Sequence, residues 1–133
     1  MRLVEIVLFD DPPLEEMANL FKDDTGIDYP LWIGKVGGHH GPRIKVSNIP
    51  HKMRLDNCFV VSVSQTPEVL TPQTCTIPAK EVQQILQWIR INFDDLMILW
   101  WMFERGASSV KDEDTGTILT HSSVIDGLQK LSS

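Results

Sequence analysis

The chain has 133 residues, of which 42% are apolar and 23% are charged, and its formal net charge is −6. This length suffices for one domain with its own core, and the composition is too apolar for a disordered chain. The acidic balance argues against nucleic-acid binding, which needs a basic surface, and no apolar run approaches the roughly 20 residues of a membrane span.

The first residues and the two cysteines indicate a cytoplasmic protein. The stretch Met1–Phe9 contains Glu5 and is followed by two aspartates, a pattern that is not typical of a signal peptide. Cys58 and Cys75 lie far apart, and neither belongs to a Cys-x-x-Cys pair. We therefore expect two free thiols in a reducing compartment, with no metal site and no cofactor.

The N-terminal part of the sequence predicts a strand followed by a helix. Arg2–Phe9 is rich in apolar residues on both faces, and we expect this strand to join the main sheet. Asp11-Pro12 is typical of a helix start, because aspartate caps free N–H groups and proline is tolerated in the first turn. Apolar residues at helical spacing continue to Phe21, and the aspartates and glycine of residues 23–26 are expected to end this helix.

The middle of the chain predicts three strands. We expect the first over Ile27–Val36, a turn rich in glycine and histidine over residues 37–42, and a second strand over Arg43–Ser47. The third strand, Cys58–Ser64, alternates apolar and polar residues. Its expected core face carries Phe59, Val61 and Val63.

A long amphipathic helix is predicted from Pro78 to the residue before Gly106. Residues 92–95, Asn-Phe-Asp-Asp, predict a kink or break in this helix, because asparagine and aspartate side chains compete for backbone hydrogen bonds. Residues 107–133 are rich in Ser, Thr, Asp and Gly, and we expect them to form a loosely attached polar tail.

The turn before the second strand is a candidate site for chemistry. His39 and His40 lie between glycines, and imidazole can act as an acid, a base or a ligand near neutral pH. Arg43 and Lys45 follow on one face of the strand and are candidate anion-binding residues. The alternative is a solvated turn with ordinary surface charges, and we favour it because no Cys, Asp or Glu stands nearby in the sequence to complete a zinc site.

The end of the long helix is a candidate interface. Residues 96–103 form a run of eight apolar residues, so the helix is apolar around its whole circumference and must be covered on every side. The cover comes either from the N-terminal elements and the tail or from another chain. The candidate interface residues are Ile98, Trp100, Trp101 and Met102.

Short motifs between residues 27 and 103 occur in a recognisable order. They are His39, Pro42, Val46, Thr66–Leu70, Ile77-Pro78, Trp88-Ile89 and Leu96–Trp100. This order resembles an uncharacterised family of small bacterial α+β domains. Its members carry an Asp-His-x-Pro-Pro turn, a His-Phe-His-Val strand, a Glu-Val-Leu turn and a Leu-Pro helix ending in tryptophan.

The resemblance implies a small α+β fold and, often, a neighbouring gene for a second small protein, as in toxin–antitoxin pairs. The two histidines of the family's strand fall on Arg43 and Lys45 here, and the Asp of the turn and one proline fall on Gly38 and Gly41. These departures weaken any expectation of histidine chemistry carried over from the family. Residues 1–24 and 107–133 lie outside the resemblance.

These observations predict an α+β domain over residues 1–106. We expect an antiparallel sheet of about four strands, with one long C-terminal helix packed across it and a shorter N-terminal helix.

We expect a cytoplasmic protein-interaction module that acts by binding and occlusion, of the toxin–antitoxin, phage-defence or counter-defence type. Its acidic surface suits a basic partner protein, or the chain forms a homo-oligomer, with no direct contact to nucleic acid or membrane. One alternative is a small enzyme or phosphate-ligand-binding domain centred on the His39-His40 turn, although we favour a non-enzymatic role. The other alternative is a structural subunit of an oligomer.

Overall fold

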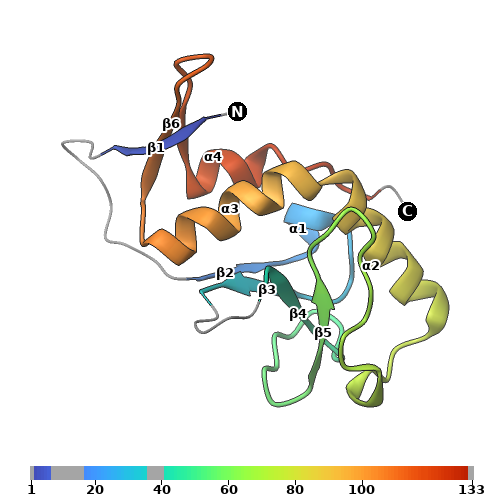
Figure 1. Cartoon of the computed structure of the whole chain (residues 1–133). Coiled ribbons are helices and arrows are strands. Elements are labelled where there is room, and N and C mark those ends of the chain that lie inside the picture. The colour runs from blue at the N-terminus through green and yellow to red at the C-terminus, as the bar shows by residue number, and fades with distance from the viewer. Residues whose placement is uncertain (1, 7–16, 36–40, 132–133) are drawn as a thin grey trace.

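Two antiparallel sheets and four α-helices form the described part of the chain (Figure 1). The computed structural model describes residues 2–6, 17–35 and 41–131. The strands are β1 (Leu3–Ile6), β2 (Met17–Leu20), β3 (Leu31–Gly34), β4 (Arg43–Ser47), β5 (Cys58–Ser62), β6 (Ser109–Asp112) and β7 (Ile118–Thr120). The helices are α1 (Lys22–Thr25), α2 (Ala79–Ile91), α3 (Phe93–Arg105) and α4 (His121–Asp126), with a short 3-10 helix at Pro72–Thr74. The predicted α+β class is confirmed.

The larger sheet has the order β2-β3-β4-β5. Successive residues of a strand point to opposite faces, so the antiparallel register aligns one apolar face across all four strands. That face is buried and carries Leu20, Leu31, Ile33, Ile44, Val46, Phe59 and Val61. The outer edge of β5 is partly paired, because Leu70 N–H donates to the Val60 carbonyl and Val69 bridges to Val61.

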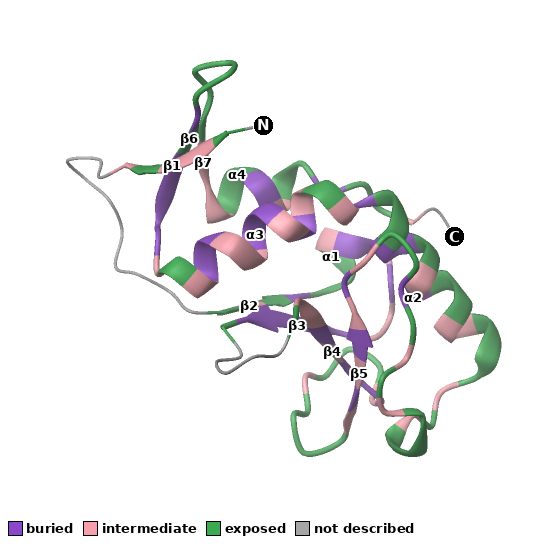
Figure 2. Cartoon of the chain, viewed as in Figure 1, coloured by how far each residue is buried: buried purple, intermediate pink, exposed green. Residues whose placement is uncertain are grey.

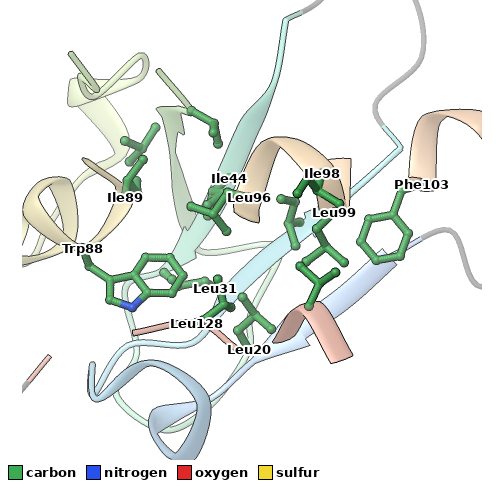
Figure 3. Packing of buried hydrophobic residues seen from close by; sticks show 14 of the residues in the cluster. Leu20, Leu31, Ile44, Trp88, Ile89, Leu96, Ile98, Leu99, Phe103 and Leu128 are labelled. Atoms are coloured by element: carbon green, nitrogen blue, oxygen red, sulfur yellow. The ribbon is translucent and has the colours of Figure 1, made fainter. Parts of the chain in front are cut away.

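Helices α2 and α3 lie over the buried face of this sheet (Figure 1). Their inward side chains, among them Trp88, Leu96, Leu99 and Phe103, are fully buried. Figure 3 shows the Trp88 ring beside the side chains of the sheet and of the C-terminal segment, including Leu31 and Leu128. The core therefore lies between the sheet and the helix pair.

The predicted break in the long helix is confirmed, and the single long helix is in fact two helices that meet at Asn92. Asn92 is only 2% exposed, and its side chain donates to the carbonyls of Trp88 and Gln129 and accepts from Gln129 N–H at 2.7 Å. An asparagine satisfies these backbone groups where the helix is interrupted. The same side chain also ties the C-terminal segment to the helix junction.

The prediction of a loosely attached tail is wrong for residues 107–131. Val110, Val124 and Leu128 belong to the same core cluster as the sheet and α3. Leu131 N–H donates to the Thr25 carbonyl at 2.8 Å, so the segment is also tied to α1. The polar composition of this segment concealed a few apolar residues at core positions, and these residues decide its packing.

The N-terminal strand was predicted to join the main sheet, and this is also wrong. Strand β1 pairs with β6 in a separate three-stranded sheet of order β1-β6-β7 (Figure 1). The pairing extends from Leu3 opposite Asp112 to Ile6 opposite Ser109. Because the partner strand comes from the tail, the sequence before β2 could not reveal this pairing. Residues 7–9 of the predicted strand lie outside the described part.

The predicted N-terminal helix is replaced, in its described part, by a strand and one helical turn. Met17–Leu20 pairs with β3 as strand β2, and α1 comprises only Lys22–Thr25. Apolar residues at positions 17, 20 and 21 suit a helix by spacing, but pairing with β3 outweighs this local preference. Gly26 ends α1, rather than the predicted longer helix, with φ at +77°, and the two aspartates lie within α1. Residues 11–16 lie outside the described part.

The remaining strand predictions agree with the structure more closely. The expected strands over Arg43–Ser47 and Cys58–Ser64 correspond to β4 and β5, and the strand expected from Ile27 is confined to Leu31–Gly34. Both cysteines are free thiols, as expected. Figure 2 shows that the connection between β4 and β5 is largely exposed, whereas β3 is buried along its whole length.

Candidate functional site

The outer face of the larger sheet brings together two of the predicted anion-binding residues. Arg43 and Lys45 lie two residues apart on β4 and point away from the core face that holds Ile44 and Val46. In Figure 1, α2 and α3 lie on the opposite side of the sheet, and no α-helix of the described residues covers this side. His39 and His40, in the loop that leads into β4, lie outside the described residues.

Trp32 completes this face, and sequence reasoning missed it. Trp32 is opposite Lys45 in the register, and the Lys45 Nζ atom lies 4.7 Å from the centroid of the indole ring. The indole Nε1–H donates to the Met17 Sδ atom at 3.0 Å, which holds the ring against β2. Alternation in β3 carried a usable signal, since Trp32 stands between two core residues and must point outward. We call Trp32, Arg43 and Lys45 the cationic face.

The two cations of this face have no carboxylate partner in the described part of the chain. Neither Arg43 nor Lys45 forms an ion pair with any carboxylate in the described ranges. The Arg43 Nε atom is buried and has no hydrogen-bond partner among the residues that the structure describes. A buried donor without an acceptor costs about 1–3 kcal/mol. The unpaired charges of Arg43 and Lys45, rather than the buried Nε atom, make the cationic face suited to an anionic group.

The interface prediction is wrong for two of the four residues in α3. Ile98 is 7% exposed and Met102 is fully buried, and both belong to the chain's own core. The cover comes from α4 and from the strands after α3, which the sequence could not place. These two side chains are therefore not available to bind another chain.

Trp100 and Trp101 are half-buried at the surface of α3. The Arg105 guanidinium lies 4.5 Å from the centroid of the Trp101 ring, and Arg105 also reaches Glu5 of β1 at 3.7 Å. A cation–π contact of this kind covers the ring with the chain's own atoms. The Arg105 side chain thus covers part of the Trp101 ring, and the rest of the ring remains at the surface.

A hollow of about 520 Å³ lies beside α2. Its walls come from α1, α2 and the C-terminal segment: Lys22, Gly26, Ile27, Asp28, Glu81, Gln84, Gln87, Ile91, Lys130 and Leu131. A smaller hollow of about 350 Å³, lined by Phe21, Pro30 and His51 among others, adjoins it. The ion pair between Lys22 Nζ and Asp28 Oδ1, at 2.8 Å, contributes to both hollows.

Electrostatic effects are modest around these hollows. A hydrogen bond from Lys22, together with its charge, lowers the pKa of Asp28, and the same contact raises the pKa of Lys22. Burial, and then the carboxylates of Glu81 and Asp28, raise the pKa of Tyr29. Asp28 and Glu81 both line the larger hollow.

A third hollow of about 290 Å³ lies between α3, α4 and the β6–β7 hairpin. Asp95 and Asp112 line it together with apolar residues such as Ile98 and Val124. Burial, and then the neighbouring carboxylate of Asp94, raise the pKa of Asp95. Within the described ranges, no group of three or more His, Cys, Asp or Glu side chains is arranged to hold a metal ion. In the same ranges, no helix has the length and apolar character needed to cross a membrane.

The fold and the half-buried cations of β4 thus define an α+β protein with a candidate binding face. The chain matches no protein-family model, and no significant match was found among curated proteins or solved structures.

Proposed function

We propose that the chain is a cytoplasmic protein-interaction module that acts by binding and occlusion, and that its partner docks on the cationic face. The observation that carries this proposal is the pair of half-buried cations, Arg43 and Lys45, that have no carboxylate partner among the described residues. A carboxylate of the partner would pair with the Arg43 guanidinium and neutralise the adjacent Lys45 ammonium group. The toxin–antitoxin, phage-defence or counter-defence setting remains part of the proposal and rests on the family resemblance.

The partner that suits this face is a protein with an acidic segment. Residues two apart on a strand are separated by about 6.5–7 Å, so Arg43 and Lys45 can contact successive acidic side chains. The net charge of −6 would by itself favour a basic partner, but it also repels acidic chains from the rest of the surface. Recognition of an acidic segment would therefore be confined to the cationic face, which favours specific binding.

A second candidate function is the binding of a phosphate-containing ligand next to the His39-His40 turn. The unpaired charge of Arg43 favours it too, because phosphate oxygens, like carboxylate oxygens, accept hydrogen bonds from guanidinium groups. The two candidates differ in the size of the anion and in the need for the histidines.

Charge reversal on β4 tests both candidates. We expect a fluorescein-labelled octaglutamate peptide to bind the wild-type protein and to bind the Arg43→Glu/Lys45→Glu variant about tenfold or more weakly, because attraction becomes repulsion. Fluorescence anisotropy measures the affinity, which should also fall as salt is added. Lys80→Glu/Arg90→Glu, which reverses two exposed charges on α2, is the matched control and should leave binding unchanged.

The same titration with pyrophosphate separates the two candidates. The ligand proposal would replace the interaction proposal if the wild type binds pyrophosphate but not octaglutamate, and if a His39→Ala/His40→Ala variant no longer binds pyrophosphate. If neither probe binds the wild type at millimolar concentration, the cationic face is not an anion site. The Arg43→Gln/Lys45→Gln variant, checked by circular dichroism, guards against misfolding caused by charge reversal.

A further inference from the structure

The hollow beside α2 is lined mainly by polar residues, and we call it the α2 groove. Glu81, Gln84, Gln87 and Ile91 line it from one side of α2, at helical spacing. The helix rises 1.5 Å per residue, so Glu81 and Ile91 are separated by about 15 Å along the groove. Lys22, Asp28 and the C-terminal segment form the opposite wall. The groove is therefore long enough for several residues of an extended chain.

The two ends of the α2 groove carry opposite charges. Glu81 lies in the first turn of α2, and Asp28, which also lines the groove, has its charge balanced by Lys22. Lys130 follows Gln129, and two hydrogen bonds hold Gln129 against Asn92, directly after the end of α2. Within the described residues, neither Glu81 nor Lys130 forms an ion pair. One uncompensated carboxylate and one uncompensated ammonium group thus stand at opposite ends.

We propose that the α2 groove binds an extended peptide segment of about five residues, with a basic side chain at the Glu81 end and an acidic side chain at the Lys130 end. An extended chain advances about 3.3 Å per residue, so five residues cover the length of the groove. Between the two charges, the exposed amides of Gln84 and Gln87 can donate to and accept from the peptide backbone. This site is separate from the cationic face, and its proposal does not depend on that face.

The charge pattern favours a peptide over a small zwitterion. A free amino acid carries its charges on neighbouring atoms and cannot reach both Glu81 and Lys130 across about 15 Å of helix. The wall that holds Lys130 is fixed by hydrogen bonds from the C-terminal segment to Asn92 and Thr25. Because this wall is rigid, the charges of Glu81 and Lys130 stay a fixed distance apart. Only a peptide long enough to span that distance can contact both.

Two labelled hexapeptides test the proposal. One has arginine first, glutamate last and alternating serine and alanine between them, and the other has the two charged residues exchanged. We expect the wild-type protein to bind one order at least fivefold more tightly than the other, and tenfold more tightly than a peptide with glutamine at both ends. In the variant Glu81→Lys/Lys130→Glu, which keeps the net charge, the preferred order should invert.

Several results would overturn the proposal. They are equal affinity for both orders, no binding of either hexapeptide at millimolar concentration, and an unchanged preference in the charge-swapped variant. An arginine–glutamate dipeptide that binds as tightly as the hexapeptide would show a small-zwitterion site instead. Gln83→Lys, an exposed change on α2 outside the groove, should preserve the preference. The Arg43→Glu/Lys45→Glu variant should also preserve it, so failure of one proposal leaves the other testable.

Discussion

Truncation of the chain after Gly106 is expected to abolish cooperative folding. The deletion removes Val110, Val124 and Leu128, which are at most 5% exposed and belong to the common core. Burial of three such side chains contributes roughly 5–9 kcal/mol, a large share of the ~5–15 kcal/mol that stabilises a typical domain. The deletion also uncovers Met102 and Ile98 on α3. Urea unfolding followed by circular dichroism should show a broad transition or none for residues 1–106.

A pair of point variants makes the same test without shortening the chain. Val124→Asp places a carboxylate in the core and should destabilise the protein by several kcal/mol, on the order of what an uncompensated buried charge costs. Ile118→Asp changes a side chain that is 48% exposed in the neighbouring strand β7, and its effect should stay within about 0.5 kcal/mol. If residues 1–106 unfold cooperatively at the same urea midpoint as the full chain, the segment after Gly106 is a loose tail after all.

Replacement of Gly26 by alanine is expected to be far more damaging than the same replacement at Gly106. Both glycines end a helix with positive φ, at +77° and +64°. The left-handed backbone costs an alanine about 1–2 kcal/mol at either position. A Cβ atom on residue 26 would collide with the Leu131 carbonyl oxygen and lie 2.9 Å from the Leu131 nitrogen, whereas a Cβ atom on residue 106 has no neighbour within 4 Å.

The difference between the two variants isolates the contact between α1 and the C-terminal segment. Gly26→Ala should lose about 2 kcal/mol more than Gly106→Ala, because Leu131 must move and its hydrogen bond to Thr25 is strained. Chemical denaturation gives both free energies of unfolding under one set of conditions. Equal losses would mean that the segment around Leu131 yields freely, and they would also weaken the argument for a rigid wall in the α2 groove.

The candidate sites differ in how much the sequence revealed. Alternation in β4 placed Arg43 and Lys45 together on one face, and this was predictable because neighbouring residues of a strand are a fixed distance apart. The α2 groove was not predictable, since its walls come from residues 22–28, 81–91 and 130–131. Only the folded chain brings these three segments side by side. The hydrogen bonds between Asn92 and Gln129 place Lys130 near the end of α2, whereas Glu81 lies at its start.

Local signals in the sequence were sufficient for β4, β5, the helix break at Asn92 and the stop at Gly106, because alternation, backbone-seeking side chains and left-handed glycines act within a few residues. The tertiary structure decided the rest. Met17–Leu20 became a strand because β3 offers it hydrogen bonds, and β1 found its partner β6 more than 100 residues further along the chain. The apolar side of α3 is covered by α4 because a few well-placed apolar residues outweigh a polar composition. Burial depends on which segments meet, and that is set by the whole chain rather than by any single stretch of it.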